Sequence, residues 1–69
     1  MDPALFLLQF FAYEHLKNEA LQLTSKQFAL VAHNLVATLP ANPERTAALR
    51  KLLEAKDCAV RAMLAKDVT

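Results

Sequence analysis

The sequence predicts an all-α fold, a small helical hairpin with a short N-terminal helix that assembles into a homo-oligomer. Three observations support this. The 69 residues contain no glycine, and Ala, Leu, Lys and Glu dominate, which favours helix over hairpin turns and strands. Apolar side chains recur at spacings of three and four in the last third of the chain. The first residues carry more apolar side chains than two further helices can cover.

The length permits a single domain over residues 1–69. A chain this short buries only about 60% of the surface that its unfolded state exposes, so an isolated monomer has little stability. Cys58 is the only cysteine, which excludes an intrachain disulfide. His15 and His33 lack the spacing of zinc ligands, and we expect no metal and no cofactor. Association with other copies is therefore the expected source of stability.

The apolar stretch over residues 3–12 does not look like a signal peptide or a membrane span. Asp2 precedes it where a signal peptide carries a cation. Gln9 interrupts it and Glu14 follows it, so it falls short of the roughly 20 apolar residues that a spanning helix needs. With one free cysteine besides, the sequence predicts a cytoplasmic protein.

The clearest helix start lies after the middle of the chain. Asn42 is a good N-cap, Pro43 suits the first helical position, and Glu44 favours the positive end of the helix dipole. We expect a long helix over residues 43–66. It carries a seam of mostly small side chains that suits close packing against another helix, namely Ala48, Leu52, Ala55, Ala59 and Ala62.

A second helix is expected over residues 25–38, with Thr24 as N-cap and Gln27 closing a capping box. Two prolines follow it closely, and a connection this short makes the two helices antiparallel. Asp2 and Pro3 could open a further helix over residues 3–12. Residues 13–23 fit either an irregular linker or a frayed helix, and the sequence leaves both open.

Catalysis is not expected. The simplest interpretation of Cys58, which follows Asp57 inside the predicted long helix, is a packed or idle thiol. A chain without glycine cannot form a Gly-rich phosphate loop. The net charge of +1 is too small for the basic stripe that duplex nucleic acid requires. A small phosphate-bearing ligand, held between subunits, needs only a few cations and an aromatic ring. The available residues are Tyr13, His15, Lys26, Arg45 and Arg50.

Three motifs resemble one known family. Residues 11–15 read FAYEH, the middle helix closes on Leu39-Pro40, and residues 43–55 read PERTAALRKLLEA. In order and spacing they look like the helical-hairpin family of small phage proteins that includes the anti-CBASS cyclic-nucleotide sponges. The likeness covers about residues 11 to 65. Asp57-Cys58 departs from the family pattern, which tends to have an apolar Met-Trp pair there, and Glu14 is inserted between Tyr13 and His15.

The resemblance implies a function. Members of this family form compact oligomers, often hexamers, that sequester cyclic di- and trinucleotides made by bacterial immune synthases and do not cleave them. By position, Tyr13 resembles the aromatic that stacks on a base, and Lys26 and Arg45 match basic residues near the starts of the two long helices. The resemblance therefore predicts a phage anti-defence protein acting in the host bacterial cytoplasm.

Each of these residues also has a structural interpretation. Tyr13 could cap the apolar cluster, Lys26 could be a surface lysine, and Arg45 and Arg50 could be solvated partners of nearby glutamates. His33, on the polar side of the middle helix, suits an interface. The alternative function is a structural or adaptor oligomer that binds a partner protein and no nucleotide, with the aromatic N-terminal segment as the contact.

Overall fold

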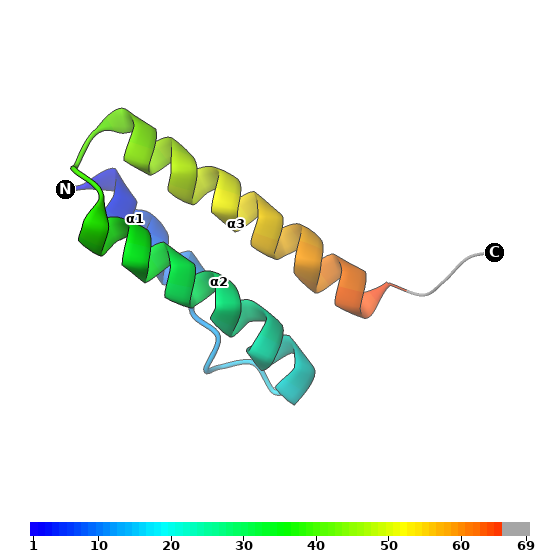
Figure 1. Cartoon of the computed structure of the whole chain (residues 1–69). Helices are drawn as coiled ribbons and strands as arrows, with labels where there is room; N and C mark the ends of the chain where they lie inside the picture. The colour runs from blue at the N-terminus through cyan, green and yellow to red at the C-terminus, as the bar shows by residue number, and fades with distance from the viewer. Residues whose placement is uncertain (66–69) are drawn as a thin grey trace.

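The computed structural model describes residues 1–65, which contain helices and no strand. In chain order these are α1 (Pro3–Leu8), a short 3-10 helix η1 (Gln9–Phe11), α2 (Glu19–Thr38) and α3 (Pro43–Leu64). Helices α2 and α3 form an antiparallel hairpin, and α1 with η1 lies behind it against both (Figure 1). The predicted all-α hairpin with a short N-terminal helix is confirmed.

The start of α3 agrees with the prediction. The Asn42 side chain accepts a hydrogen bond from the Arg45 amide at 2.9 Å, and Pro43 occupies the first helical turn. The helix continues to Leu64. Its predicted end at Lys66 lies outside the described residues.

The predicted start of α2 at residue 25 is wrong, because the helix begins at Glu19. Asn18 is the N-cap, and its side-chain oxygen accepts from the amides of Ala20 at 2.8 Å and Leu21 at 3.3 Å. Glu19 places a negative charge in the first turn, which the helix dipole favours. The undecided segment 13–23 therefore divides into a connection before Asn18 and the first turn of α2.

The N-terminal helix begins as predicted and ends slightly earlier than the expected residue 12. Asp2 caps it, accepting from the Ala4 amide at 2.9 Å, and Pro3 is in the first turn. After Leu8 the chain tightens into η1, and Ala12 turns extended with ψ of 141°. The chain thereby leaves the helix axis and crosses toward the start of α2.

The core is small and contains several alanines. Phe11 and Leu49 are its largest fully buried apolar side chains, and the other buried apolar residues are Ala4, Leu7, Ala29 and Ala32. Small side chains at these contacts let α1 approach the hairpin closely. The predicted seam of α3 is only partly covered: Ala48, Leu52 and Ala59 are half-buried, whereas Ala55 and Ala62 are exposed.

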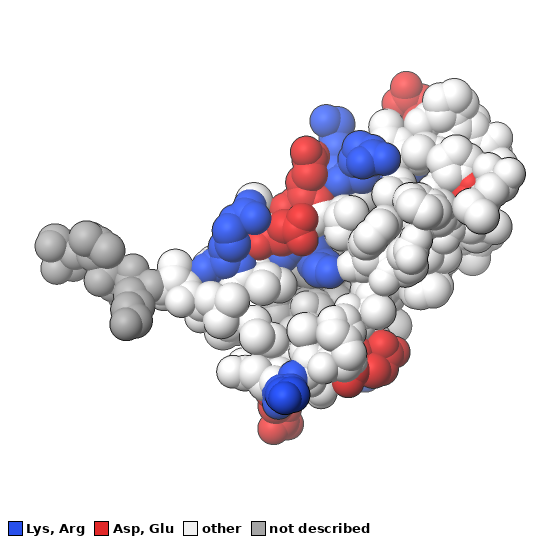
Figure 2. Space-filling view, turned by 180° about the vertical axis from the view of Figure 1, so that it is seen from behind, with Lys and Arg blue, Asp and Glu red and all other residues white. Residues whose placement is uncertain are grey.

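Several large apolar side chains of α1 and η1 remain in solvent. Leu5, Phe6 and Phe10 are each about half exposed, and the Phe6 and Phe10 rings pack edge to face at 5.7 Å between centroids. Figure 2 shows the molecule from the side of α1, where a broad uncharged surface adjoins charged side chains gathered along α3. Among residues 1–65, no helix combines the length and hydropathy that a bilayer crossing requires.

Candidate functional site

Arg45, predicted as a phosphate contact, is instead buried inside the fold. Its Nη1 donates to the carbonyl oxygens of Val36 at 3.2 Å and Leu39 at 3.5 Å, and its Nη2 pairs with the Asp2 carboxylate. Only 7% of its side chain is exposed. The guanidinium therefore joins the start of α1, the end of α2 and the first turn of α3, and it does not face a ligand. We assign Arg45 a structural role.

Tyr13 lines a hollow of about 260 Å³ between η1, the following connection and α2. The ring is half-buried and packs against the core, while Leu30 and His33 of α2 form the opposite wall. Leu30 is 61% exposed, so this wall is open to an incoming molecule. The hollow thus offers an aromatic ring, an exposed aliphatic side chain and an imidazole.

Glu14 holds a negative charge at the edge of this hollow. Its carboxylate accepts from the Tyr13 amide at 3.2 Å. Hydrogen bonds from the backbone amides of Glu14 itself and of Tyr13 lower the pKa of this carboxyl, and the nearby imidazoles of His15 and His33 add to that effect. The group is therefore ionised at neutral pH. It repels phosphate and can accept hydrogen bonds from the amino groups of a base.

Lys26 lies on the same side of α2 as the wall of this hollow. It precedes Ala29 and Leu30 by one helical turn and His33 by two, and residues at such spacings share a face. The side chain is exposed, and within residues 1–65 it forms no ion pair with a carboxylate. Lys26 therefore lies on the side of α2 that borders the hollow of Tyr13, one turn before the residues that line it.

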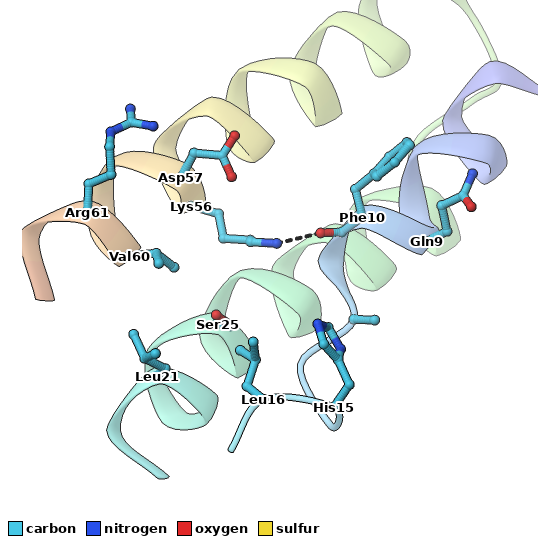
Figure 3. Close-up of a pocket in the computed structure, with 11 residues that line it drawn as sticks. Gln9, Phe10, His15, Leu16, Leu21, Ser25, Lys56, Asp57, Val60 and Arg61 are labelled. Carbon is cyan, nitrogen blue, oxygen red and sulfur yellow. Dashed lines mark hydrogen bonds between the residues drawn. The ribbon is translucent and has the colours of Figure 1, made fainter. Parts of the chain in front are cut away.

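His15 lies elsewhere, in a larger cleft of about 480 Å³. The cleft is bounded by η1, the connection, the first turns of α2 and the second half of α3 (Figure 3). Lys56 spans it and donates to the Phe10 carbonyl oxygen, and Arg61 donates to the Cys58 sulfur at 3.3 Å. Sequence reasoning did not identify Lys56 as a cleft residue, since its approach to η1 depends on how α1 and η1 pack against α3.

The remaining predicted residue, Arg50, is exposed on α3 and lines neither hollow. A third hollow of about 580 Å³ lies where α1 and α3 begin. Its side-chain polar groups include Asp2 and Asn42, which already cap the two helices. That hollow consequently offers few free polar groups to a ligand.

Within residues 1–65, no group of three or more His, Cys, Asp or Glu side chains could hold a metal ion. Comparisons with protein-family models, curated proteins and solved structures gave no match. The strongest candidate for function among the described residues is accordingly the face that carries Tyr13, Glu14, Lys26 and His33.

Proposed function

We propose that the chain is a phage anti-defence protein that binds cyclic di- or trinucleotide immune signals in the host bacterial cytoplasm and sequesters them without cleavage. The observation that carries the proposal is the half-buried Tyr13 ring in a hollow whose α2 wall, Leu30 and His33, lies on the same side of that helix as Lys26. An aromatic ring beside a cation is what a nucleotide needs, because the base stacks and the phosphate pairs with the charge.

Each group beside the hollow has a role in this proposal. Tyr13 stacks on a base, an interaction worth about 1 to 3 kcal/mol per base. The Lys26 ammonium contacts a phosphate. The ionised Glu14 carboxylate accepts a hydrogen bond from an amino or imino group of the base. A negative charge beside Tyr13 is therefore compatible with binding the base, although it repels phosphate.

The proposal includes a homo-oligomer, because the hollow is too small for the whole ligand. Its volume of about 260 Å³ is below the range of about 300 to 1,000 Å³ that is typical of small-molecule sites. A second copy placed over the exposed Leu30 would enclose the ligand from the other side. The exposed apolar side chains of α1 and η1 provide further contact area for assembly. The family resemblance favours a hexamer.

The decisive experiment measures binding to Tyr13 and Lys26 variants. The purified protein is titrated by calorimetry with a panel of cyclic di- and trinucleotides. We expect Tyr13→Ala and Lys26→Ala to weaken binding of the best ligand by at least about tenfold, since each removes a stacking or charged contact. Lys51→Ala, at an exposed position of α3, is the matched control and should bind like the parent. Normal binding by both site variants would refute the site.

A second candidate function rests on the exposed apolar side of α1. Leu5, Phe6 and Phe10 suit contact with a partner protein as well as with another copy. If the chain is a structural or adaptor oligomer, no cyclic nucleotide will change its melting temperature, and Phe6→Asp will abolish capture of the partner. A ligand-induced shift that Tyr13→Ala removes would decide against this candidate.

A further inference from the structure

The backbone holds the carboxylate of Glu14 beside the Tyr13 ring. Its Oε2 accepts from the Tyr13 amide at 3.2 Å, and both residues line the hollow of about 260 Å³. Hydrogen bonds from the Glu14 and Tyr13 amides lower the pKa of this carboxyl most, and the imidazoles of His15 and His33 lower it further. His33 belongs to the opposite wall of the hollow. The negative charge therefore lies at the hollow, next to the ring.

This carboxylate retains acceptor positions for a bound molecule. An ionised carboxylate has about four such positions, and the Tyr13 and Glu14 amides take two of them. In the part of the chain that the structure describes, the single ion pair joins Arg45 to Asp2, so no cationic side chain neutralises Glu14. A ligand that suits the hollow consequently offers hydrogen-bond donors, and preferably two, to Glu14.

Among the four bases of RNA, guanine has the edge that matches such an acceptor pair. Its Watson–Crick edge carries an imino and an amino donor side by side. Adenine and cytosine have one amino donor next to a ring nitrogen that accepts, and uracil has one imino donor between two carbonyl oxygens. On each of those three edges an acceptor-only carboxylate meets a lone pair and is repelled.

We propose that Glu14 makes the hollow selective for cyclic nucleotides that contain guanine. The base stacks on Tyr13, and its imino and amino groups donate to the Glu14 carboxylate. The phosphates, which this carboxylate repels, lie toward Lys26. This inference rests on the proposed function and goes beyond it, because it names the base that is bound and the residue that recognises it.

Calorimetric titrations of the full chain with cyclic di-GMP and with cyclic di-AMP test the proposal. The two ligands share the phosphate–sugar ring and a purine that can stack, and they differ only in the groups on the base. We expect cyclic di-GMP to bind at least about tenfold more tightly, as is typical of a bidentate contact to a base. Equal affinities, or tighter binding of cyclic di-AMP, would overturn the proposal.

Glu14→Gln should change the base preference while keeping the size of the side chain. A glutamine amide presents an acceptor beside a donor, which suits adenine and opposes one of the two guanine donors. We expect this variant to lose most of the preference for cyclic di-GMP or to reverse it. Its melting temperature should stay near that of the parent, because the amide oxygen can still accept from the Tyr13 amide. Glu54→Gln, the same change at an exposed position of α3, should keep the parental ratio.

Glu14→Ala separates recognition of the base from positioning of the chain. If Glu14 recognises guanine, this variant will weaken binding of cyclic di-GMP more than binding of cyclic di-AMP. If Glu14 only fixes the connection before α2, Glu14→Ala will weaken both equally and Glu14→Gln will keep the parental ratio, which would refute this inference alone. If the parent binds neither ligand, the failure lies with the proposed function itself.

Discussion

At the residue scale, Arg45 shows how a sequence-based assignment of a binding residue fails. Its place after Pro43-Glu44 suggested a free cation at a helix start. It is four residues before Leu49, which is fully buried, so the two share the inward face of α3. The predicted seam began at Ala48 and did not include Arg45, although Arg45 lies three residues earlier on the same side of the helix. Periodicity indicated a helix, and only the packing of α1 fixed which stripe is buried.

Removing the Arg45 guanidinium should strongly destabilise the protein. Arg45→Met leaves the carbonyl oxygens of Val36 and Leu39 and the Asp2 carboxylate without this donor. We expect a loss of about 2 to 4 kcal/mol in the free energy of unfolding. Urea denaturation followed by circular dichroism measures it. Arg50→Met, at an exposed position, should change stability by no more than about 0.5 kcal/mol. Equal effects at both positions would contradict the structural role of Arg45.

The same ion pair predicts a pH dependence. The Ala4 amide, and secondarily Arg45, lower the pKa of Asp2 from its ordinary value of 3.8. Because this pKa is lower in the folded than in the unfolded state, the ionised carboxylate stabilises the fold at a pH above the unfolded-state pKa. That stabilisation is lost as the pH falls through the folded-state pKa. Asp2→Asn keeps a capping side chain and removes the charge. It should melt below the parent at neutral pH, and the two melting temperatures should converge below 3.8. If the difference between the two melting temperatures does not change with pH, this explanation is wrong.

At the element scale, the caps explain both the correct helix starts and the wrong one. Asp2-Pro3 and Asn42-Pro43 combine a capping side chain with a proline in the first turn, and both begin helices as predicted. For α2 the sequence offers two starts, at Asn18 and at Thr24. The earlier start adds helical residues in which the Leu21 side chain is half-buried and the Gln22 side chain donates to the Leu16 carbonyl oxygen. That gain comes from tertiary packing, which local signals do not contain.

The Asn18 cap can be tested by substitution. Asn18→Ala removes the acceptor for the Ala20 and Leu21 amides and should cost about 1 kcal/mol in the free energy of unfolding. Thr24→Ala, inside the helix, should cost less or even stabilise, because alanine has the higher helix propensity. Thermal unfolding of both variants gives the comparison. If Thr24→Ala lowers the free energy of unfolding more than Asn18→Ala does, the result would instead support a helix that begins after Thr24.

At the scale of the whole molecule, the sequence predicts the excess of apolar surface but not how it is arranged. The apolar residues of the first helix were expected to exceed what the hairpin covers, and Leu5, Phe6 and Phe10 indeed remain exposed. The approach of Tyr13 to α2 follows from the path of the connection after η1. The cleft with Lys56 and Arg61 follows from how α2 and α3 diverge. The spacing of residues along the sequence predicts neither the approach of Tyr13 nor the cleft.

If the uncharged side of α1 mediates assembly, a charge there will separate the subunits. Phe6→Asp places a carboxylate among apolar contacts and should convert the oligomer to smaller species, detected by size-exclusion chromatography with light scattering. Ala47→Asp puts the same charge at an exposed position of α3 and should leave the assembly unchanged. Identical masses for the parent and Phe6→Asp would exclude this surface as the contact.

The central claim is that an oligomer of this chain holds cyclic oligonucleotides intact. Native mass spectrometry of the purified protein mixed with a panel of cyclic di- and trinucleotides tests it most directly. We expect an oligomer that carries a fixed number of ligand molecules, each released afterwards with its mass unchanged, and we expect Tyr13→Ala to form the same oligomer without ligand. A folded oligomer that retains no cyclic nucleotide, or that releases a cleaved one, would contradict the claim.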